Sequence, residues 1–189
     1  MDDPFEQHAE AYDRWFDEHP AEYRAELARV RQLLPTPDSR TVEVGAGSGR
    51  FAAPLGIGIG IEPSRALGRM ARRRGIDVVR GRAEVLPLAS GACSCVLLVT
   101  VICFLEDPVP ALRELHRVLA PGGTLVLAFI ERGGPIARRY LLKGGKRRFL
   151  SHARFYSAGE VTALLEDAGF RVERVDARTG FCVMAAQKD

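Results

Sequence analysis

The stretch Val42-Glu-Val-Gly-Ala-Gly-Ser-Gly-Arg50 leads from a short apolar run into three glycines at alternate positions. The residues from Thr41 to Val44 predict a strand, and the glycines predict a tight turn directly after it. Such a turn lets the backbone approach a ligand closely and presents its amides to a polar or anionic group. A tight turn without a ligand is the alternative. Because position 50 is arginine, the sixth-position glycine of the dinucleotide fingerprint is missing, which weakens a nicotinamide-dinucleotide interpretation.

Strands and helices alternate along the chain after this turn. The apolar pattern predicts strands at 56–62, 76–79, 94–100 and 124–130, helices at 63–74, 110–119 and 157–168, and a closing hairpin from 171–178 and 181–187. This alternation implies right-handed crossovers and a mostly parallel sheet. The predicted fold class is α/β: a doubly wound, Rossmann-like, seven-stranded sheet of five parallel strands plus a C-terminal hairpin, with helices on both faces.

The residues before the first strand predict two helices. Aromatic and apolar side chains recur every three or four positions from Tyr12 to Leu34. His19-Pro20 divides this run, because a residue before proline is pushed out of the helical region. We therefore add N-terminal capping helices to the predicted fold.

The composition of the 189 residues, 47% hydrophobic and 27% charged, indicates one globular domain and not a disordered chain. The longest apolar run, from Cys95 to Leu105, is too short to span a bilayer, and the first residues show no secretory signal. Four cysteines without framework spacing favour a reducing cytosol. These features predict a cytoplasmic protein without a membrane partner.

The net charge of +3 is unevenly distributed. Residues 1–26 carry nine acids and two bases, whereas residues 131–155 carry eight bases and one acid. A protein that coats nucleic acid would be uniformly basic, so no nucleic-acid partner is predicted. The basic segment has three interpretations: a solvated loop, a lid that pairs with the acidic N-terminal cap, or a site for an anionic acceptor.

Glu62 ends the second predicted strand, seventeen residues after Gly45. An acid at this place can accept hydrogen bonds from both ribose hydroxyls of a nucleoside ligand. A carboxylate that favours the positive end of the following helix, next to Pro63, is the compatible alternative.

Six segments, in register from residue 41 to about 175, resemble the class I S-adenosylmethionine-dependent methyltransferases of the small type 11 group. They are Glu43-Val-Gly-Ala-Gly-Ser-Gly49, Gly60-Ile-Glu62-Pro-Ser64, Gly81-Arg-Ala-Glu-Val-Leu-Pro87, Phe104-Leu-Glu-Asp-Pro108, Leu115-His-Arg-Val-Leu-Ala-Pro-Gly-Gly123 and Leu165-Glu-Asp-Ala-Gly-Phe170. The resemblance implies S-adenosyl-L-methionine as cofactor, S-adenosyl-L-homocysteine as product, and in-line methyl transfer to a small-molecule acceptor.

The resemblance also implies cofactor contacts for twelve residues. They are Tyr12, Trp15, Glu43, Gly45, Ala46, Gly47, Gly49, Glu62, Pro63, Ala83, Glu84 and Thr100. The glycines would pass beneath the methionine part, Glu43 would orient its amino group, and Glu62 would hold the ribose. Many relatives place aspartate at position 82, but Arg82 has no acceptor for the adenine amine. That contact would pass to Glu84 or to backbone.

The predicted single domain, residues 1–189, then divides into four parts. These are a helical N-terminal cap at 1–37, a cofactor-binding core at 41–130, a basic lid or substrate-recognition insert at 131–156, and a C-terminal helix and hairpin at 157–189. Tyr140, Phe149 and Phe155 are candidates for the acceptor pocket, because they lie in or beside the basic insert.

Catalytic groups are harder to assign. In-line methyl transfer needs a general base only when the acceptor arrives protonated, and His8 and His152 are the candidates for that role. The Cys93-x-Cys95 spacing lacks the second pair of a zinc site, so no metal is predicted and buried cysteines are expected. Two alternatives stay open: an NAD(P)-dependent oxidoreductase on a similar fold, and a catalytically inactive S-adenosylmethionine-binding protein.

Overall fold

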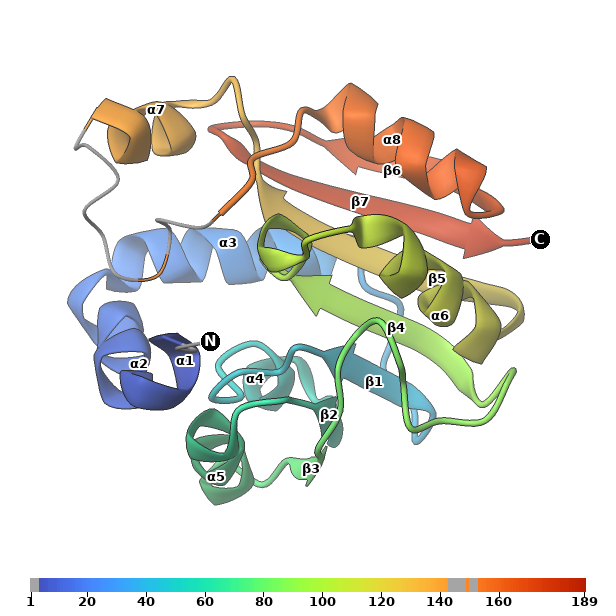
Figure 1. Ribbon diagram of the computed structural model, residues 1–189, viewed down its shortest axis with the longest axis horizontal. Helices are drawn as coiled ribbons and strands as arrows, with labels where there is room; N and C mark the ends of the chain where they lie inside the picture. The colour runs from blue at the N-terminus through green and yellow to red at the C-terminus, as the bar shows by residue number, and fades with distance from the viewer. Residues whose placement is uncertain (1–3, 143–148, 150–152) are drawn as a thin grey trace.

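The computed structural model describes residues 4–142, 149 and 153–189, without the side chains of residues 140–142. Seven strands form one sheet in the order β3-β2-β1-β4-β5-β7-β6 (Figure 1). The strands are β1 Thr41–Val44, β2 Ile59–Ile61, β3 Asp77–Val79, β4 Cys93–Val99, β5 Leu119–Ile130, β6 Phe170–Asp176 and β7 Phe181–Lys188. Strands β1 to β5 pair in parallel, and β7 runs antiparallel between β5 and β6. The predicted fold class is confirmed.

Helices cover both faces of this sheet. They are α1 Pro4–Gln7, α2 Ala9–Glu18, α3 Pro20–Leu33, α4 Ala52–Leu55, α5 Arg65–Arg73, the 3₁₀ helix η1 Ile102–Phe104, α6 Pro108–Val118, α7 Pro135–Leu142 and α8 Ala158–Asp167. Figure 1 shows α6 and α8 together over one face, with α3 behind the other. It also shows α1 and α2 beyond the carboxyl ends of β1 and β4. The N-terminal cap therefore lies at the edge of the sheet where open α/β folds bind ligands.

The helix boundaries follow local signals, but two predicted starts are wrong: α6 begins at Pro108 and not at residue 110, and the start of α5 also differs. The predicted break at His19-Pro20 is confirmed, and Pro20 opens α3. The helix predicted from Pro63 begins instead at Arg65, because Ser64 is its N-cap and the Ser64 side chain accepts a hydrogen bond from the Leu67 amide at 3.1 Å. Pro63 thus precedes the helix.

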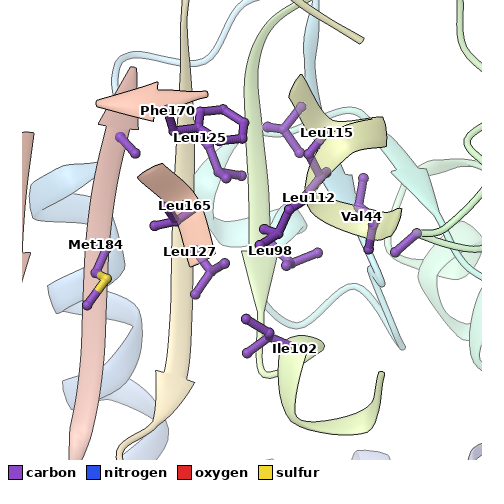
Figure 2. Packing of buried hydrophobic residues seen from close by; sticks show 14 of the residues in the cluster. Val44, Leu98, Ile102, Leu112, Leu115, Leu125, Leu127, Leu165, Phe170 and Met184 are labelled. Carbon is purple, nitrogen blue, oxygen red and sulfur yellow. The ribbon is translucent and has the colours of Figure 1, made fainter. Parts of the chain in front are cut away.

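The core has two layers, one on each face of the sheet. Along β4, Val96 and Leu98 belong to the layer under α6 and α8, whereas Cys95 and Leu97 belong to the layer shared with α3 and α4. This alternation is the two-residue period of a strand that is buried on both faces. Figure 2 shows the first layer, where side chains of α6, α8, β4 and β5 meet. All four cysteines are buried and free, as predicted.

No helix within the described part of the chain is both long and apolar enough to cross a membrane.

The start of the 131–156 insert is fixed by a close backbone approach. A methyl group added to Gly134 would lie 2.3 Å from the Cα atom of Gly180, in the turn between β6 and β7. We expect Gly134→Ala to lower the free energy of unfolding by about 1–2 kcal/mol, because backbone must move to admit the methyl group. In the control Gly133→Ala, the methyl group meets only the flexible Glu131 side chain at 3.3 Å. Urea denaturation would contradict this account if both variants lost equal stability.

Candidate active site

The glycine turn after β1 is held in a conformation that side chains disfavour. Gly45, Gly47 and Gly49 have φ angles of 72°, 55° and 84°, in the left-handed region. A methyl group on Gly45 would lie 2.2 Å from a methyl carbon of Val101, so the turn packs against the segment that follows β4. The glycines therefore serve close packing as well as backbone conformation.

Four amides of this turn are bonded within the protein, so these four are not free to face a ligand as the sequence predicts. The amides of Gly45 and Ala46 donate to the Ile61 carbonyl oxygen at 2.8 and 3.1 Å, and the amide of Gly49 donates to that of Ala46 at 2.9 Å. The Gly47 amide donates to the Glu62 carboxylate at 2.8 Å. The turn thus offers close approach to a ligand, and the neighbouring carboxylates offer the polar contacts.

Glu62 is 5% exposed and is oriented by two backbone amides. One carboxylate oxygen accepts from Gly47, and the other accepts from Ser64 at 2.9 Å. The side chain at the end of β2 therefore faces the glycine turn, as a ribose-binding acid of this fold must. This geometry is compatible with a ribose-binding role for Glu62 and also with a role at the start of α5, because Ser64 is the N-cap of that helix.

Glu43, in the middle of β1, is 2% exposed. Its Oε2 atom has no hydrogen-bond partner among the described residues. Burial raises the pKa of this carboxyl group well above its ordinary value, and the nearby Glu62 charge adds to the effect. A buried oxygen without a partner costs stability unless a ligand supplies a donor. An amino group bound above the glycine turn is such a donor.

The end of β4 carries backbone strain. Thr100 has a φ angle of 53°, which is unusual for a side chain branched at Cβ, and its amide donates to the Ala128 carbonyl oxygen at 2.7 Å. Strained residues of this kind gather at functional sites. The chain then enters η1, which brings Phe104 to the same edge of the sheet.

The residues expected near an adenine lie beyond β3. Ala83 is 7% exposed and belongs to the core. The Arg82 side chain is 75% exposed and forms an ion pair of 3.2 Å with Glu84. Arg82 thus extends into solvent, and Glu84 beside it is half-buried. Pro63 is exposed at the entrance to α5.

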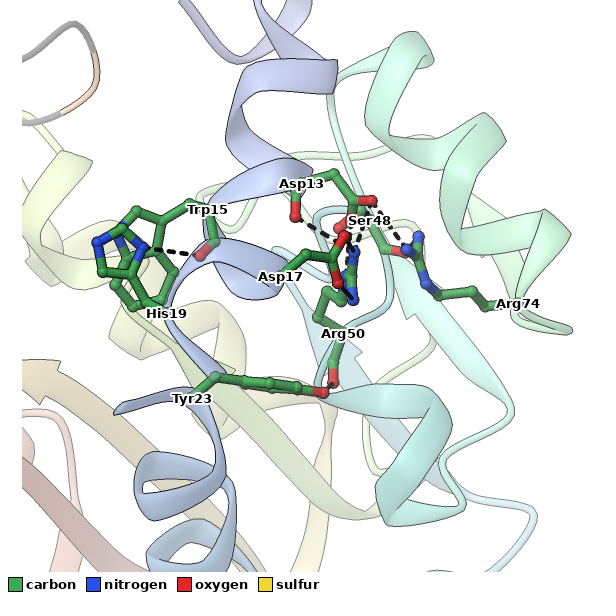
Figure 3. A network of polar contacts seen from close by, with 8 residues as sticks. All are labelled: Asp13, Trp15, Asp17, His19, Tyr23, Ser48, Arg50 and Arg74. Carbon is green, nitrogen blue, oxygen red and sulfur yellow. Dashed lines mark hydrogen bonds and ion pairs between the residues drawn. The ribbon is translucent and has the colours of Figure 1, made fainter. Parts of the chain in front are cut away.

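The N-terminal cap is bound to the glycine turn by ion pairs (Figure 3). The Arg50 guanidinium donates to Asp13 at 2.8 Å and to Asp17 at 2.7 Å, and Arg74 donates to Asp13 at 2.9 Å. Partial burial alone would raise the pKa of Asp13, but the hydrogen bonds from Arg50 and Arg74 outweigh it and hold the pKa well below its ordinary value. Among the described residues, the partners of Asp13 and Asp17 are Arg50 and Arg74 of the predicted cofactor-binding core. Pairing of the cap with the basic insert stays a prediction, because four of the insert's basic residues lie outside the described residues.

Tyr12 and Trp15, the two predicted cover residues, differ in their contacts. A methyl group on Gly47 would lie 3.4 Å from the Tyr12 ring, so Tyr12 rests on the glycine turn. Burial raises the pKa of Tyr12. Trp15 instead stacks on His19, with 4.7 Å between ring centroids, and meets Phe16 edge-on. Figure 3 shows it turned away from Arg50.

The acceptor and base candidates are only partly described. Phe149 contacts Tyr12 and Phe5, with ring centroids 5.7 and 5.5 Å apart, and Phe155 is half-buried. His8 lines a cavity of about 410 Å³ between the cap and α5. His152 and the Tyr140 side chain lie outside the described residues, as do Lys143, Lys146, Arg147 and Arg148 of the basic segment.

Sequence reasoning missed three aromatic residues near this edge. Phe5 and Phe104 contact each other, with 4.9 Å between ring centroids. Tyr156 is 3% exposed, and its hydroxyl has no partner within the described ranges. No periodic signal marks these positions, because each acquires its neighbours only when distant segments meet. Among the described side chains, no group of three His, Cys, Asp or Glu residues is arranged to hold a metal ion.

A mostly parallel sheet with a glycine turn after β1 and an acid directly after β2 defines a nucleoside-binding Rossmann-like fold. A family model described as a methyltransferase domain matches residues 42–127. An S-adenosylmethionine-dependent methyltransferase from Thermotoga maritima superposes with a TM-score of 0.90, at 36% identity over 98% of each chain. An uncharacterized Methanocaldococcus jannaschii protein is 36% identical over 88% of this chain and 80% of its own length.

A Mycobacterium tuberculosis protein is 40% identical over 87% of this chain, which spans 59% of that relative's length. The chain therefore belongs to the class I S-adenosylmethionine-dependent methyltransferases, in the type 11 group. Its cofactor is S-adenosyl-L-methionine. The resemblance inferred from the sequence is confirmed.

Proposed function

We propose that the protein transfers a methyl group from S-adenosylmethionine to a small-molecule acceptor in the cytoplasm and releases S-adenosylhomocysteine. The observation that carries this proposal is the pair of buried carboxylates at the glycine turn. Glu43 has an oxygen without a partner among the described residues, and Glu62 faces the turn. Together they suit a ligand with an amino group at one end and a ribose at the other.

The residues fit S-adenosylmethionine in the following way. Glu43 would orient the amino group, Glu62 would accept from the ribose hydroxyls, and Ala83 with Glu84 would border the adenine. Gly45, Ala46, Gly47 and Gly49 would admit the methionine part to close contact, with Pro63 and Thr100 at the two ends. Tyr12 and Trp15 would cover the cofactor. When bound, S-adenosylmethionine supplies a methyl group on a sulfonium, which an acceptor atom can attack directly.

The protein's own contribution is positioning. Holding the attacking atom in line with the methyl group and excluding water can supply much of the rate. The described residues that suit this task are the aromatic side chains of the cap and of η1. A protonated acceptor would need a base, for which His8 and His152 remain the candidates.

The small size of the acceptor is supported by the relative from Thermotoga maritima, which is described as a possible histamine N-methyltransferase. That protein matches nearly the whole chain, which supports acceptor sites built from corresponding segments in the two proteins. Tyr140, Phe149 and Phe155 would then contribute to the pocket, and the arginines of the insert would suit an anionic group on the acceptor.

Calorimetry followed by turnover tests the proposal. We expect S-adenosylmethionine and S-adenosylhomocysteine to bind with 1:1 stoichiometry and NAD to show no heat of binding. Release of S-adenosylhomocysteine is then followed over a panel of small amines, phenols, thiols and carboxylates. Tight cofactor binding without turnover of any compound would favour the inactive binding protein. Binding of NAD in place of S-adenosylmethionine would favour the oxidoreductase.

A further inference from the structure

Four aromatic rings from four separate segments meet at the carboxyl edge of the sheet. The Phe5 ring of α1 lies 5.6 Å from Tyr12 of α2, 4.9 Å from Phe104 of η1 and 5.5 Å from Phe149 of the insert, measured between ring centroids. Tyr12 and Phe104 meet Phe5 nearly edge-on, with interplanar angles of 79°, and Phe149 is tilted by 33°. Phe5 thus occupies a seat made of three other rings.

This seat lies beside the predicted path of the cofactor. Tyr12 rests on Gly47, at the turn that follows β1. Phe104 ends the 3₁₀ helix that begins two residues after Thr100, at the end of β4. The attacking atom of an acceptor must reach this edge of the sheet, because the glycine turn and the end of β4 converge there.

Phe5 and Phe104 are both half-buried, but the segments that carry them differ. It belongs to a four-residue helix with no buried residue. Glu6 of α1 bonds to the start of α5, where it accepts from the Ser64 hydroxyl at 2.6 Å and from the Ala66 amide at 3.1 Å. Phe104, in contrast, follows Ile102 and Cys103, which are 1% and 2% exposed. The segment that carries Phe104 is therefore anchored in the core, whereas the segment that carries Phe5 is a four-residue helix at the surface.

We propose that the acceptor carries an aromatic ring, and that this ring takes the place of Phe5 against Phe104, Tyr12 and Phe149. The inference rests on the proposed function and names the class of acceptor. Edge-to-face aromatic pairs are favourable at centroid separations of about 4.5–7 Å. An acceptor ring that replaces the Phe5 ring keeps these contacts, whereas an aliphatic group loses their directional part. The residue that the protein itself places in the seat thus indicates the ligand that the seat fits.

The test compares two ring-deletion variants that should change affinity in opposite directions. The protein is saturated with S-adenosylhomocysteine, and binding of 2-phenylethylamine is measured by ligand-observed NMR. We expect Phe5→Ala to tighten binding about 3- to 10-fold, because the competing ring is gone. We expect Phe104→Ala to weaken it about 3- to 10-fold, because a wall is lost. Phe5→Leu fills the seat with a side chain that has no ring, so it should bind 2-phenylethylamine more weakly than Phe5→Ala does.

The saturated analogue 2-cyclohexylethylamine, with the same charge and chain length, is the matched control compound. We expect it to bind at least 3-fold more weakly than 2-phenylethylamine to the wild type and to Phe5→Ala. Weaker binding of 2-phenylethylamine in both alanine variants would overturn the proposal, because Phe5 would then contact the bound ligand and not compete with it. Equal binding of the two compounds would also overturn it. Failure of the wild type to bind S-adenosylhomocysteine would instead refute the proposed function.

Discussion

Replacing Glu62 by alanine is expected to weaken the binding of S-adenosylhomocysteine about 100-fold, which corresponds to about 2.7 kcal/mol. The carboxylate is buried and faces the glycine turn, so ribose hydroxyls would meet a charged acceptor screened from water. Hydrogen bonds to a charged group contribute about 1.5–3 kcal/mol each, and ribose offers two donors. The variant also leaves the Gly47 and Ser64 amides without their carboxylate acceptor, which loosens the turn.

Two further variants separate cofactor binding from general stability. Glu62→Gln keeps the shape of the side chain but turns an amide donor towards the Gly47 or Ser64 amide. We therefore expect it to bind S-adenosylhomocysteine more weakly than the wild type does. Glu160→Ala removes another acid that bonds backbone, the Ser157 amide at 2.7 Å, but at the start of α8. We expect it to lower stability slightly and to leave cofactor affinity unchanged. Calorimetry that finds Glu62→Ala within 3-fold of wild type would show that Glu62 only favours the start of α5.

The elements with strong local signals could be predicted from the sequence. Strand β4 is apolar and buried without a break from Cys95 to Val99, because both of its faces are covered there. Helix α8 follows a capping box in which Ser157 and Glu160 satisfy each other's backbone amides, and the sequence shows both residues at the required spacing. Glu43 and Glu62 could be singled out because the strand that carries each one fixes its position at the edge of the sheet.

The short helices could not be predicted, because tertiary contacts stabilise them. Helix α1 has only four residues, too few to be stable alone, and it is fixed by the bonds of Glu6 to the start of α5. Those bonds join residues about 60 positions apart in the chain. The seat around Phe5 depends on the same long-range approach, so no periodicity in the sequence marks it.

Arg50 shows how a departure from a motif can acquire its meaning only in the fold. In the sequence, Arg50 occupies the position of the sixth-position glycine of the dinucleotide fingerprint. In the structure it pairs with Asp13 and Asp17, which lie 37 and 33 positions earlier. The acidic character of the N-terminal cap predicts a basic partner. In the structure, Arg50 of the cofactor-binding core is part of that partner.

Replacing Arg50 by methionine is expected to lower the free energy of unfolding by about 3 kcal/mol at pH 7. The side chains of Arg50 and Asp13 are 17% and 18% exposed, so the pair is largely shielded from solvent. Removing one partner of such a pair leaves a charge with poor compensation, which typically costs about 3–5 kcal/mol when burial is complete. Asp13 keeps Arg74, and Asp17 is exposed, so the lower end of this range applies.

The same network predicts the response to acid. The pKa of Asp13 is lower in the folded protein than in the unfolded chain, so its contribution is present above the unfolded value and disappears as the pH falls below about 4. Wild type should therefore lose more stability than Arg50→Met between pH 5 and pH 3, as measured by urea denaturation. Arg31→Met is the matched control, because Arg31 donates to the Pro54 carbonyl oxygen at 2.8 Å and not to a carboxylate.

We expect Arg31→Met to lose less than 1 kcal/mol and to keep the acid response of wild type. Because Arg50 directly follows Gly49, loss of its ion pairs should also release the cap from the glycine turn and so weaken cofactor binding. An Arg50→Met protein that retained both the stability and the acid response of wild type would show that apolar contacts alone, such as those of Phe16 with Phe51, hold the cap in place.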